Sequence, residues 1–188
     1  MTAQPRQPMS YAEYLVAEAK SDVKHDYVNG EAYARAGGTI EHGALAVAFA
    51  QQVFCGSQGQ PCRAFNSDVR VRVESTGGTF YPDLSVVCGK LESSADDQHA
   101  IANPVVLVEV LSEGTEAYDR GAKAGHYRRL ASLREYVLVS QTERKVEVQR
   151  LTARGTWELF FFGPGERVQL ESIEISFSVD DLYANPLS

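Results

Sequence analysis

The segment Val105-Val106-Leu107-Val108-Glu109-Val110-Leu111 is an apolar run that holds one carboxylate, and it decides the fold. Apolar residues at nearly every position predict a central strand that is covered on both faces. A second run, Tyr81-Pro82-Asp83-Leu84-Ser85-Val86-Val87, begins with a proline and an aspartate. Because an unpaired charge inside such a strand costs several kcal/mol, two carboxylates entering one core predict a shared task. Binding a divalent cation is the leading hypothesis.

Strand alternation predicts that the two carboxylates can meet if their strands are neighbours. A hard cation such as Mg²⁺ or Mn²⁺ takes oxygen ligands from one or two carboxylates, with phosphate and water oxygens completing the shell. Two structural alternatives stay open from the residues alone. Asp83 could only cap the turn after Pro82, and Glu109 or Asp83 could pair with Arg70 or Arg72.

Local patterns predict the order of elements along the chain. Ser10-Tyr11-Ala12-Glu13 is a capping-box pattern, and Asn29-Gly30 between two strand-like runs is a strong hairpin signal. We expect helices over residues 11–20, 40–54 (largely buried) and 115–131, strands over residues 24–28, 31–35, 69–73, 81–87, 105–111 and 135–140, a loop over residues 89–103, a meander over residues 146–175 and a short helix from residue 178. The strand–helix–strand succession after residue 105 predicts a right-handed parallel crossover.

Length and composition fit a globular protein. The 188 residues are 44% hydrophobic and 23% charged, and the net charge of -7 argues against a general polyanion-coating protein. No apolar run approaches the roughly 20 residues of a membrane span, so we expect no membrane association. Cys55, Cys62 and Cys88 are odd in number and widely spaced, which favours reduced thiols in a cytoplasm over a disulfide framework or zinc site. We expect a disordered arm over residues 1–8 and one domain over residues 9–188.

Five further polar residues could complete a site. Lys123 follows an aspartate by four residues on one predicted helix face, so it could form a surface ion pair or reach over the strand end toward a water or phosphate oxygen. Asp26 lies just before the Asn-Gly turn, and His42 lies near the start of a helix, where a histidine is usually a local hydrogen-bonding residue. Arg120 and Arg128 belong to a basic cluster that is either a solvated face or a phosphate contact.

Several short segments form a combination that is more specific than any one of them. They are Tyr81-Pro82-Asp83, Val108-Glu109-Val110-Leu111-Ser112, Asp119-Arg120-Gly121-Ala122-Lys123 with Tyr127, and Leu133-Arg134-Glu135-Tyr136-Val137-Leu138-Val139. Together with Tyr11–Leu15, Tyr27–Glu31 and residues 157–170, this set resembles the Uma-two family of restriction-endonuclease-like proteins, within the PD-(D/E)XK nuclease superfamily. The resemblance runs from about Ser10 to Tyr183.

The resemblance implies an α+β fold with an α/β core, in which helices flank a mixed central sheet. An N-terminal helix and hairpin precede this core, and a C-terminal antiparallel meander follows it. Asp83 and Glu109 match the two metal-binding carboxylates, with Mg²⁺ (or Mn²⁺) as the implied cofactor. The superfamily's lysine usually lies two residues after the glutamate, where this chain has Leu111. Lys123 matches a lysine that the family carries on the following helix instead.

The resemblance also bears on two residues of the N-terminal half. Asp26 falls where the family commonly carries a glutamate, and His42 matches a histidine that is often seen there. An aspartate keeps the charge but has a shorter reach than a glutamate, so the resemblance does not settle a ligand role for Asp26.

Three hypotheses follow for function. The leading one is a metal-dependent endonuclease that hydrolyses DNA phosphodiester bonds, with Asp83, Glu109 and Lys123 in the site. The alternative is a catalytically inactive nuclease-fold module that binds DNA or a protein partner, which the net charge of -7 and Leu111 favour. The third is a structural or self-associating protein. Related folds often pair two sites for two strands, so a homodimer is also considered.

Overall fold

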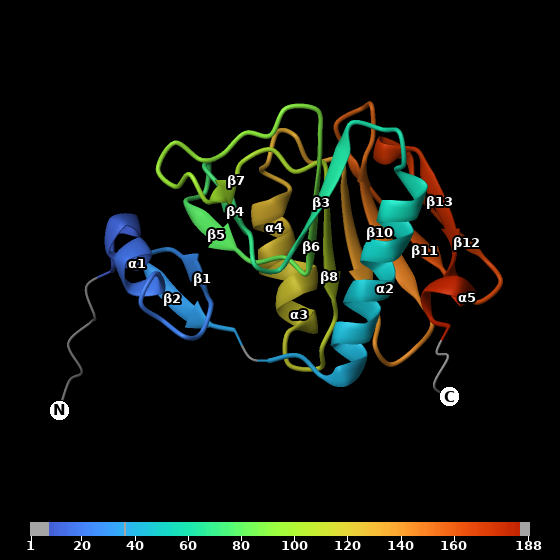
Figure 1. The fold of residues 1–188 in the computed structure, drawn as a ribbon, viewed down its shortest axis with the longest axis horizontal. Helices are drawn as coiled ribbons and strands as arrows, with labels where there is room; N and C mark the ends of the chain where they lie inside the picture. Colours follow the sequence, from blue (N-terminus) through green and yellow to red (C-terminus); the bar gives the residue numbers. More distant parts are fainter. Residues whose placement is uncertain (1–7, 36, 185–188) are drawn as a thin grey trace.

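The computed structural model describes residues 8–35 and 37–184, so residues 1–7 of the expected N-terminal arm lie outside the described residues. The chain forms three sheets and a small number of helices (Figure 1). In chain order the elements are α1 (Tyr11–Glu18), β1 (His25–Val28), β2 (Glu31–Ala34), α2 (Ile40–Gly56), β3 (Cys62–Asn66), β4 (Arg70–Val73), β5 (Gly78–Phe80), β6 (Leu84–Cys88), β7 (Ala100–Ile101), β8 (Val106–Val110), α3 (Glu116–Tyr118), the π-helical turn η1 (Asp119–Lys123), α4 (Ala124–Tyr127), β9 (Glu135–Val139), β10 (Val146–Leu151), β11 (Trp157–Phe162), β12 (Arg167–Leu170), the 3₁₀ turn η2 (Glu171–Ile173), β13 (Ile175–Ser178) and α5 (Val179–Leu182). No helix among the described residues has the length and apolar character needed to cross a bilayer.

The six-stranded sheet is the centre of the fold and is mixed, as expected. Its strand order is β11-β10-β9-β8-β6-β3. β8 and β9 are parallel, with Val106 opposite Glu135, and α3, η1 and α4 connect them. The other neighbours in this sheet are antiparallel. Of the meander expected over residues 146–175, β10 and β11 pair in this sheet, whereas β12 and β13 form a separate two-stranded sheet. The fold class is therefore α+β with a strand–helix–strand unit at its core.

The N-terminal part forms the expected helix and hairpin. The Ser10 hydroxyl accepts a hydrogen bond from the Glu13 amide, and the Glu13 carboxylate accepts one from the Ser10 amide, so the capping box caps α1. Asn29 and Gly30 both have positive φ, at 52° and 85°, which suits the tight turn between β1 and β2. The hairpin joins a five-stranded sheet of order β2-β1-β5-β4-β7.

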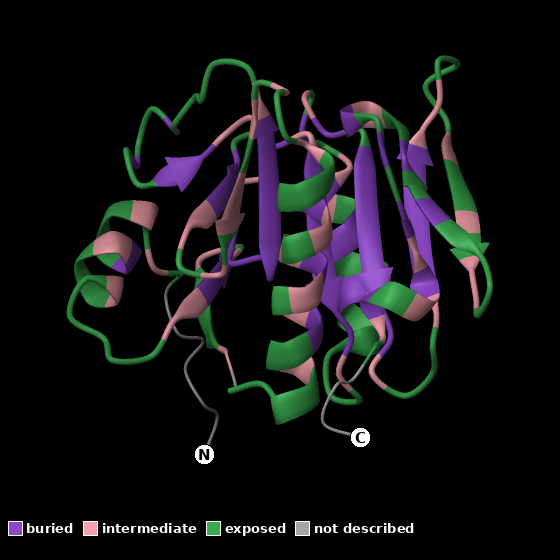
Figure 2. Ribbon diagram, turned by 45° about the vertical axis from the view of Figure 1, so that its right-hand side comes forward, coloured by how far each residue is buried: buried purple, intermediate pink, exposed green. Residues whose placement is uncertain are grey.

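Two hydrophobic clusters cover the two faces of the central sheet. On one face, α2, α5 and the β12–β13 pair pack over residues such as Val86 and Val108. On the other face, α4 and strands of the five-stranded sheet pack over Leu107 and Leu138. Figure 2 shows the central strands as the buried part of the molecule and the outer side of α2 as exposed. Glu109, the polar residue of β8, lies one residue from the end of this strand.

Three expected elements differ from the structure. Helix α2 is not largely buried, because Val47 and Phe54 are each 70% exposed and only one side of the helix packs on the sheet. The expected strand over residues 81–87 begins at Leu84, because residues 81–83 carry the chain from β5 in one sheet to β6 in another. The expected helix over residues 115–131 is three short turns that end at Tyr127.

The cysteines also differ from the expectation. Cys62 and Cys88 form a disulfide, and Cys55 is free and exposed. The antiparallel register of β3 and β6 places Cys62 directly opposite Cys88, with 4.0 Å between their Cα atoms, although 26 residues separate them in sequence. Spacing along the chain cannot reveal such a cross-strand pair. The interpretation of all three cysteines as reduced thiols was wrong, and it no longer supports a reducing compartment.

Candidate functional site

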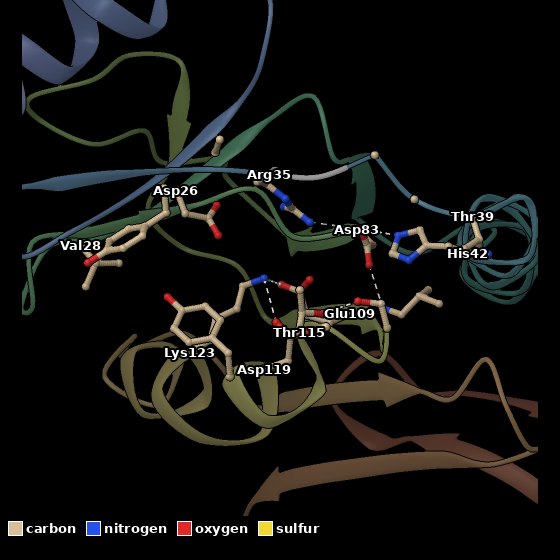
Figure 3. Close-up of a pocket in the computed structure, with 18 residues that line it drawn as sticks. Asp26, Val28, Arg35, Thr39, His42, Asp83, Glu109, Thr115, Asp119 and Lys123 are labelled. Atoms are coloured by element: carbon tan, nitrogen blue, oxygen red, sulfur yellow. Dashed lines mark hydrogen bonds and ion pairs between the residues drawn. The ribbon is translucent and has the colours of Figure 1, made fainter.

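A cavity of about 550 Å³ lies where the hairpin, the start of α2, the ends of β6 and β8, and the α3–η1 helix meet (Figure 3). Charged and titratable side chains from all of these elements point into it. They are Asp26, Arg35, His42, Asp83, Glu109, Asp119 and Lys123. Five of the seven candidate residues expected from the sequence therefore line one cavity.

Asp83 lies at the head of β6, opposite the end of β8. The register pairs Leu84 with Val108, so one further step places Asp83 opposite Glu109. The Asp83 Oδ2 atom accepts a hydrogen bond of 2.8 Å from the Val110 amide. Its Oδ1 atom lies 3.1 Å from His42 Nε2 and 3.5 Å from Arg35. Both carboxylate oxygens are thus fixed by the surrounding elements.

Glu109 and Lys123 form a buried ion pair at the floor of the cavity. The Lys123 Nζ atom lies 2.6 Å from Glu109 Oε1 and 3.2 Å from Asp119 Oδ1. The Tyr127 hydroxyl donates a hydrogen bond of 2.9 Å to the same Glu109 oxygen. Both of these contacts use Oε1, so Oε2 takes part in neither of them. Glu109 is 2% exposed and Lys123 is 3% exposed, which excludes the surface ion pair considered for this lysine.

The lysine reaches Glu109 from a helix that is locally widened. Residues Asp119–Lys123 form a π-helical turn between α3 and α4, in which one extra residue is accommodated. The Tyr136 hydroxyl donates a hydrogen bond of 3.1 Å to the Asp119 carbonyl oxygen, inside the core. The widened turn thus begins at a carbonyl that is fixed by β9 and ends at the lysine. Leu111, at the position where the superfamily usually has its lysine, is buried in the hydrophobic core instead.

The two central carboxyl groups have pKa values that move in opposite directions. Burial acts to raise the pKa of Asp83, but the hydrogen bond and charge of His42, the Val110 amide and the charge of Arg35 outweigh it, so the pKa is lowered overall. Burial raises the pKa of Glu109 to about 7, although the charge of Lys123 acts to lower it. Asp83 is therefore ionised at neutral pH, whereas Glu109 is poised near half-ionisation.

Lys123 and His42 both favour their protonated forms. Burial acts to lower the pKa of Lys123, but the nearby carboxylates of Glu109, Asp26 and Asp119 raise it overall. The hydrogen bond to Asp83 raises the pKa of His42 against the opposing effect of burial. Since carboxylates hold both protons in place, the site carries cations beside its acidic groups even without a bound metal.

Asp26 and Arg35 complete the wall formed by the hairpin. The Asp26 Oδ1 atom accepts a hydrogen bond of 3.1 Å from the Tyr81 amide, just before Asp83 in the chain. Arg35 was not predicted as a site residue, and only its place at the end of a predicted strand, in the hairpin that also holds Asp26, could have pointed to it. Its Nη1 atom is buried and has no hydrogen-bond partner among the described protein atoms, and the same holds for His42 Nδ1. Through their other nitrogen atoms, both side chains place positive charge beside Asp83.

The predicted phosphate contacts Arg120 and Arg128 lie outside the cavity lining. Arg120 forms ion pairs with Glu116 and Glu147. Arg128 donates a hydrogen bond to Gln149 and lies over the Trp157 ring. Both side chains therefore point toward β10 and β11, and the structure does not bring them to the carboxylates.

The structural alternatives for the carboxylates name the wrong arginines. Arg70 forms an ion pair with Asp97, and Arg72 donates hydrogen bonds to the Gly77 carbonyl oxygen and the Thr79 hydroxyl. Neither arginine contacts Asp83 or Glu109. The charged partners of these two carboxylates come instead from α2, the end of the hairpin and η1.

The donor set fits a hard divalent cation that keeps part of its water shell. No group of three or more His, Cys, Asp or Glu side chains within residues 8–35 and 37–184 is arranged as a metal cage. However, Mg²⁺ needs only one or two carboxylates when phosphate and water supply the other ligands. Asp83 and Glu109 both line the cavity, so a divalent cation between them would offset the negative charge of these two carboxylates. Asp83 and Glu109 are the residues that would hold it.

Comparisons with known proteins agree with the resemblance seen in the sequence. Uncharacterized protein slr1290 of Synechocystis is 34% identical over 180 residues, which is 95% of this chain and 93% of that protein. Uncharacterized protein sll1609 of the same organism is 28% identical, over 90% of this chain and 93% of that protein. A crystal structure from Anabaena variabilis, described as a putative nuclease belonging to DUF820, shares the fold with a TM-score of 0.75 and 19% identity, covering 94% of this chain and 98% of that one. The Uma2 family, whose description is "Putative restriction endonuclease", matches residues 11–181, and the chain therefore belongs to this family.

Proposed function

We propose that the protein is a Mg²⁺- or Mn²⁺-dependent endonuclease that hydrolyses phosphodiester bonds in DNA. The observation that carries the proposal is the buried contact of 2.6 Å between Lys123 Nζ and Glu109, in the same cavity as Asp83. Membership of the Uma2 family, whose description is "Putative restriction endonuclease", supports the same proposal. This chain has Leu111 where the superfamily usually has its lysine. Instead, Lys123 of η1 brings an amine to Glu109 from another part of the fold.

Four residues that line the cavity have a defined part in the proposed reaction. Asp83 and Glu109 would hold the cation, which would supply an activated water and offset charge on a phosphoryl oxygen. The ion pair with Lys123 keeps Glu109 oriented and would place positive charge next to the reacting phosphate. Arg35, whose guanidinium lies 3.5 Å from Asp83, would add a second positive charge beside a phosphate bound at that carboxylate.

Cleavage assays test this proposal directly. We expect purified protein to cut at least one of plasmid, single-stranded or branched DNA in Mg²⁺ or Mn²⁺, and we expect EDTA to abolish the reaction. Asp83→Asn, Glu109→Gln and Lys123→Met should each lower the rate by about 100-fold or more. The exposed residues Asp181 and Glu158 supply matched controls, since Asp181→Asn and Glu158→Gln make the same chemical changes far from the cavity. Cleavage of no substrate, or equal cleavage by the cavity variants, would refute the proposal.

The second candidate function is a nuclease-fold module that binds DNA or a protein without turnover. Its specific support is that Arg35, His42 and Lys123 already contact the two carboxylates that would bind the metal. Calorimetric titration with Mg²⁺ and Mn²⁺ separates the two candidates. Metal binding that Asp83→Asn abolishes supports the enzyme, whereas no binding to the wild-type protein leaves only the binding module.

The homodimer and the cytoplasmic location stay predictions. Two copies of the cavity would place one site on each of two DNA strands, and sedimentation equilibrium of the purified protein tests this assembly. For location, fractionation of cells that express the chain is the corresponding test.

A further inference from the structure

The groups that would meet a phosphate lie at the floor of a recess. Glu109 and Lys123 are almost fully buried, and Asp83 is buried beside them. A sphere with the cavity volume of about 550 Å³ is about 10 Å across, whereas the major groove alone of B-form DNA is about 12 Å wide. An intact duplex therefore cannot enter the recess, but a single nucleotide unit can. Figure 3 shows the floor residues between the hairpin wall and the α3–η1 wall.

Two tyrosines belong to the opposite walls of this recess. Tyr33 is on β2 and is 52% exposed, and Tyr118 ends α3 and is 38% exposed. Both line the cavity, and the Tyr33 hydroxyl donates a hydrogen bond to Glu31 that helps to orient its ring. Exposed aromatic rings beside a phosphate-sized site are suited to stacking with bases.

The few positive charges of the recess favour base stacking over binding to the phosphates of a duplex. Duplex binding depends on many lysine and arginine contacts to phosphates. Among the described residues, the permanently cationic side chains that line the cavity are Arg35 and Lys123, and both already contact carboxylates. Arg120 and Arg128 point elsewhere, and the whole chain carries a net charge of -7. Base stacking does not require many positive charges, so this surface can bind a nucleic-acid base through its tyrosine rings.

We propose that the cavity takes an unpaired DNA strand, with a base stacked on Tyr33 and Tyr118 and the adjoining phosphate at Asp83 and Glu109. The inference rests on the proposed nuclease function and names its substrate class as single-stranded DNA. A double helix would have to open before its phosphate reached the floor. The two tyrosines are positioning residues in this arrangement, since they would hold the base and leave the reacting groups to the buried floor.

Binding measurements test the inference independently of cleavage. The probes are a fluorescein-labelled 12-nucleotide oligothymidylate and a labelled 12-base-pair duplex, each titrated with protein in Ca²⁺ and followed by fluorescence anisotropy. We expect the single strand to bind at least about tenfold more tightly than the duplex. Tyr33→Leu and Tyr118→Leu should each weaken single-strand binding by between about 5-fold and 100-fold. Tyr33→Phe and Tyr118→Phe should retain binding, because they keep the ring.

The control is Phe161→Leu, which removes an exposed aromatic ring from β11, outside the cavity lining. It should bind like the wild type. Equal affinity for strand and duplex, no binding to either probe, or wild-type binding by both leucine variants would overturn the inference. Tyrosine-dependent binding without cleavage in Mg²⁺ or Mn²⁺ would support the inference and refute the proposed hydrolysis. Cleavage of duplex DNA with no preference for single strands would support the proposed hydrolysis and refute the inference.

Discussion

Replacing Glu109 with glutamine should change how the stability of the metal-free protein depends on pH. The folded state holds the pKa of this carboxyl at about 7, compared with an ordinary value of 4.5, and burial is the main cause. Between pH 4.5 and pH 7, the folded protein therefore keeps a proton on Glu109 that the unfolded chain has already released. Because the folded state has the more protonated carboxyl, stability falls as pH rises through this window.

The size of the effect follows from the shift. One pKa unit corresponds to 1.36 kcal/mol, so this single carboxyl should lower the free energy of unfolding by between about 2 and 3 kcal/mol from pH 5 to pH 8. Glu109→Gln removes the titrating group. The variant also removes the carboxylate nearest to Lys123, but Asp26 and Asp119 still act to raise the pKa of that amine.

The assay is urea denaturation in EDTA at pH 5, 6, 7 and 8 for the wild type, Glu109→Gln and the exposed control Glu158→Gln. The quantity of interest is the difference in unfolding free energy between each variant and the wild type. For Glu109→Gln this difference should shift in favour of the variant as pH rises, and for Glu158→Gln it should stay flat. A flat difference for Glu109→Gln would mean that Glu109 ionises normally, and a shift in the opposite direction would mean that its pair with Lys123 outweighs burial.

Three further changes have defined outcomes. Lys123→Met removes the cation beside Glu109, so the pKa of that carboxyl should rise further and the pH range of falling stability should extend above pH 8 in the same assay. Glu135→Gln disrupts a fully buried carboxylate that accepts hydrogen bonds from an arginine, a serine hydroxyl and two backbone amides. Urea denaturation should show that the unfolding free energy falls by about 3 kcal/mol, with metal binding unchanged. A loss below about 1 kcal/mol would contradict this expectation. Reduction of the Cys62–Cys88 disulfide, which closes a loop with a sequence separation of 26, should lower the unfolding free energy by about 3 kcal/mol, and a Cys62→Ser, Cys88→Ser variant should then be insensitive to dithiothreitol.

Elements with local signals could be predicted from the sequence. The capping box at Ser10, the Asn29-Gly30 turn and the apolar run around Glu109 each act through neighbouring residues, and each forms the expected element. The convergence of Asp83 with Glu109 needed one further assumption, that their strands are adjacent, and β6 and β8 are indeed paired. Period-two alternation then placed both side chains on one face of the sheet.

The features that escaped prediction depend on three-dimensional pairing. Cys62 meets Cys88 only through the register of β3 and β6, which no short pattern encodes. Arg35 has no distinctive neighbours in sequence and enters the site only because the hairpin folds back against Asp83. The exposure of Val47 on α2 was missed for a related reason, since apolar residues around a helix do not reveal how many of its sides are covered.

The π-helical turn at Asp119–Lys123 has opposite effects on helix stability and on the geometry of the site. Such a turn contains one residue more than regular α-helix would need. Deletion of the exposed Gly121 would restore regular helical hydrogen bonding and remove a residue with poor helix propensity. The same deletion would rotate the segment before it by about one residue, or roughly 100°, relative to the segment after it. Lys123 could then no longer pair with both Glu109 and Asp119 in their present places, so the irregular helix is the form that selection for the site would keep.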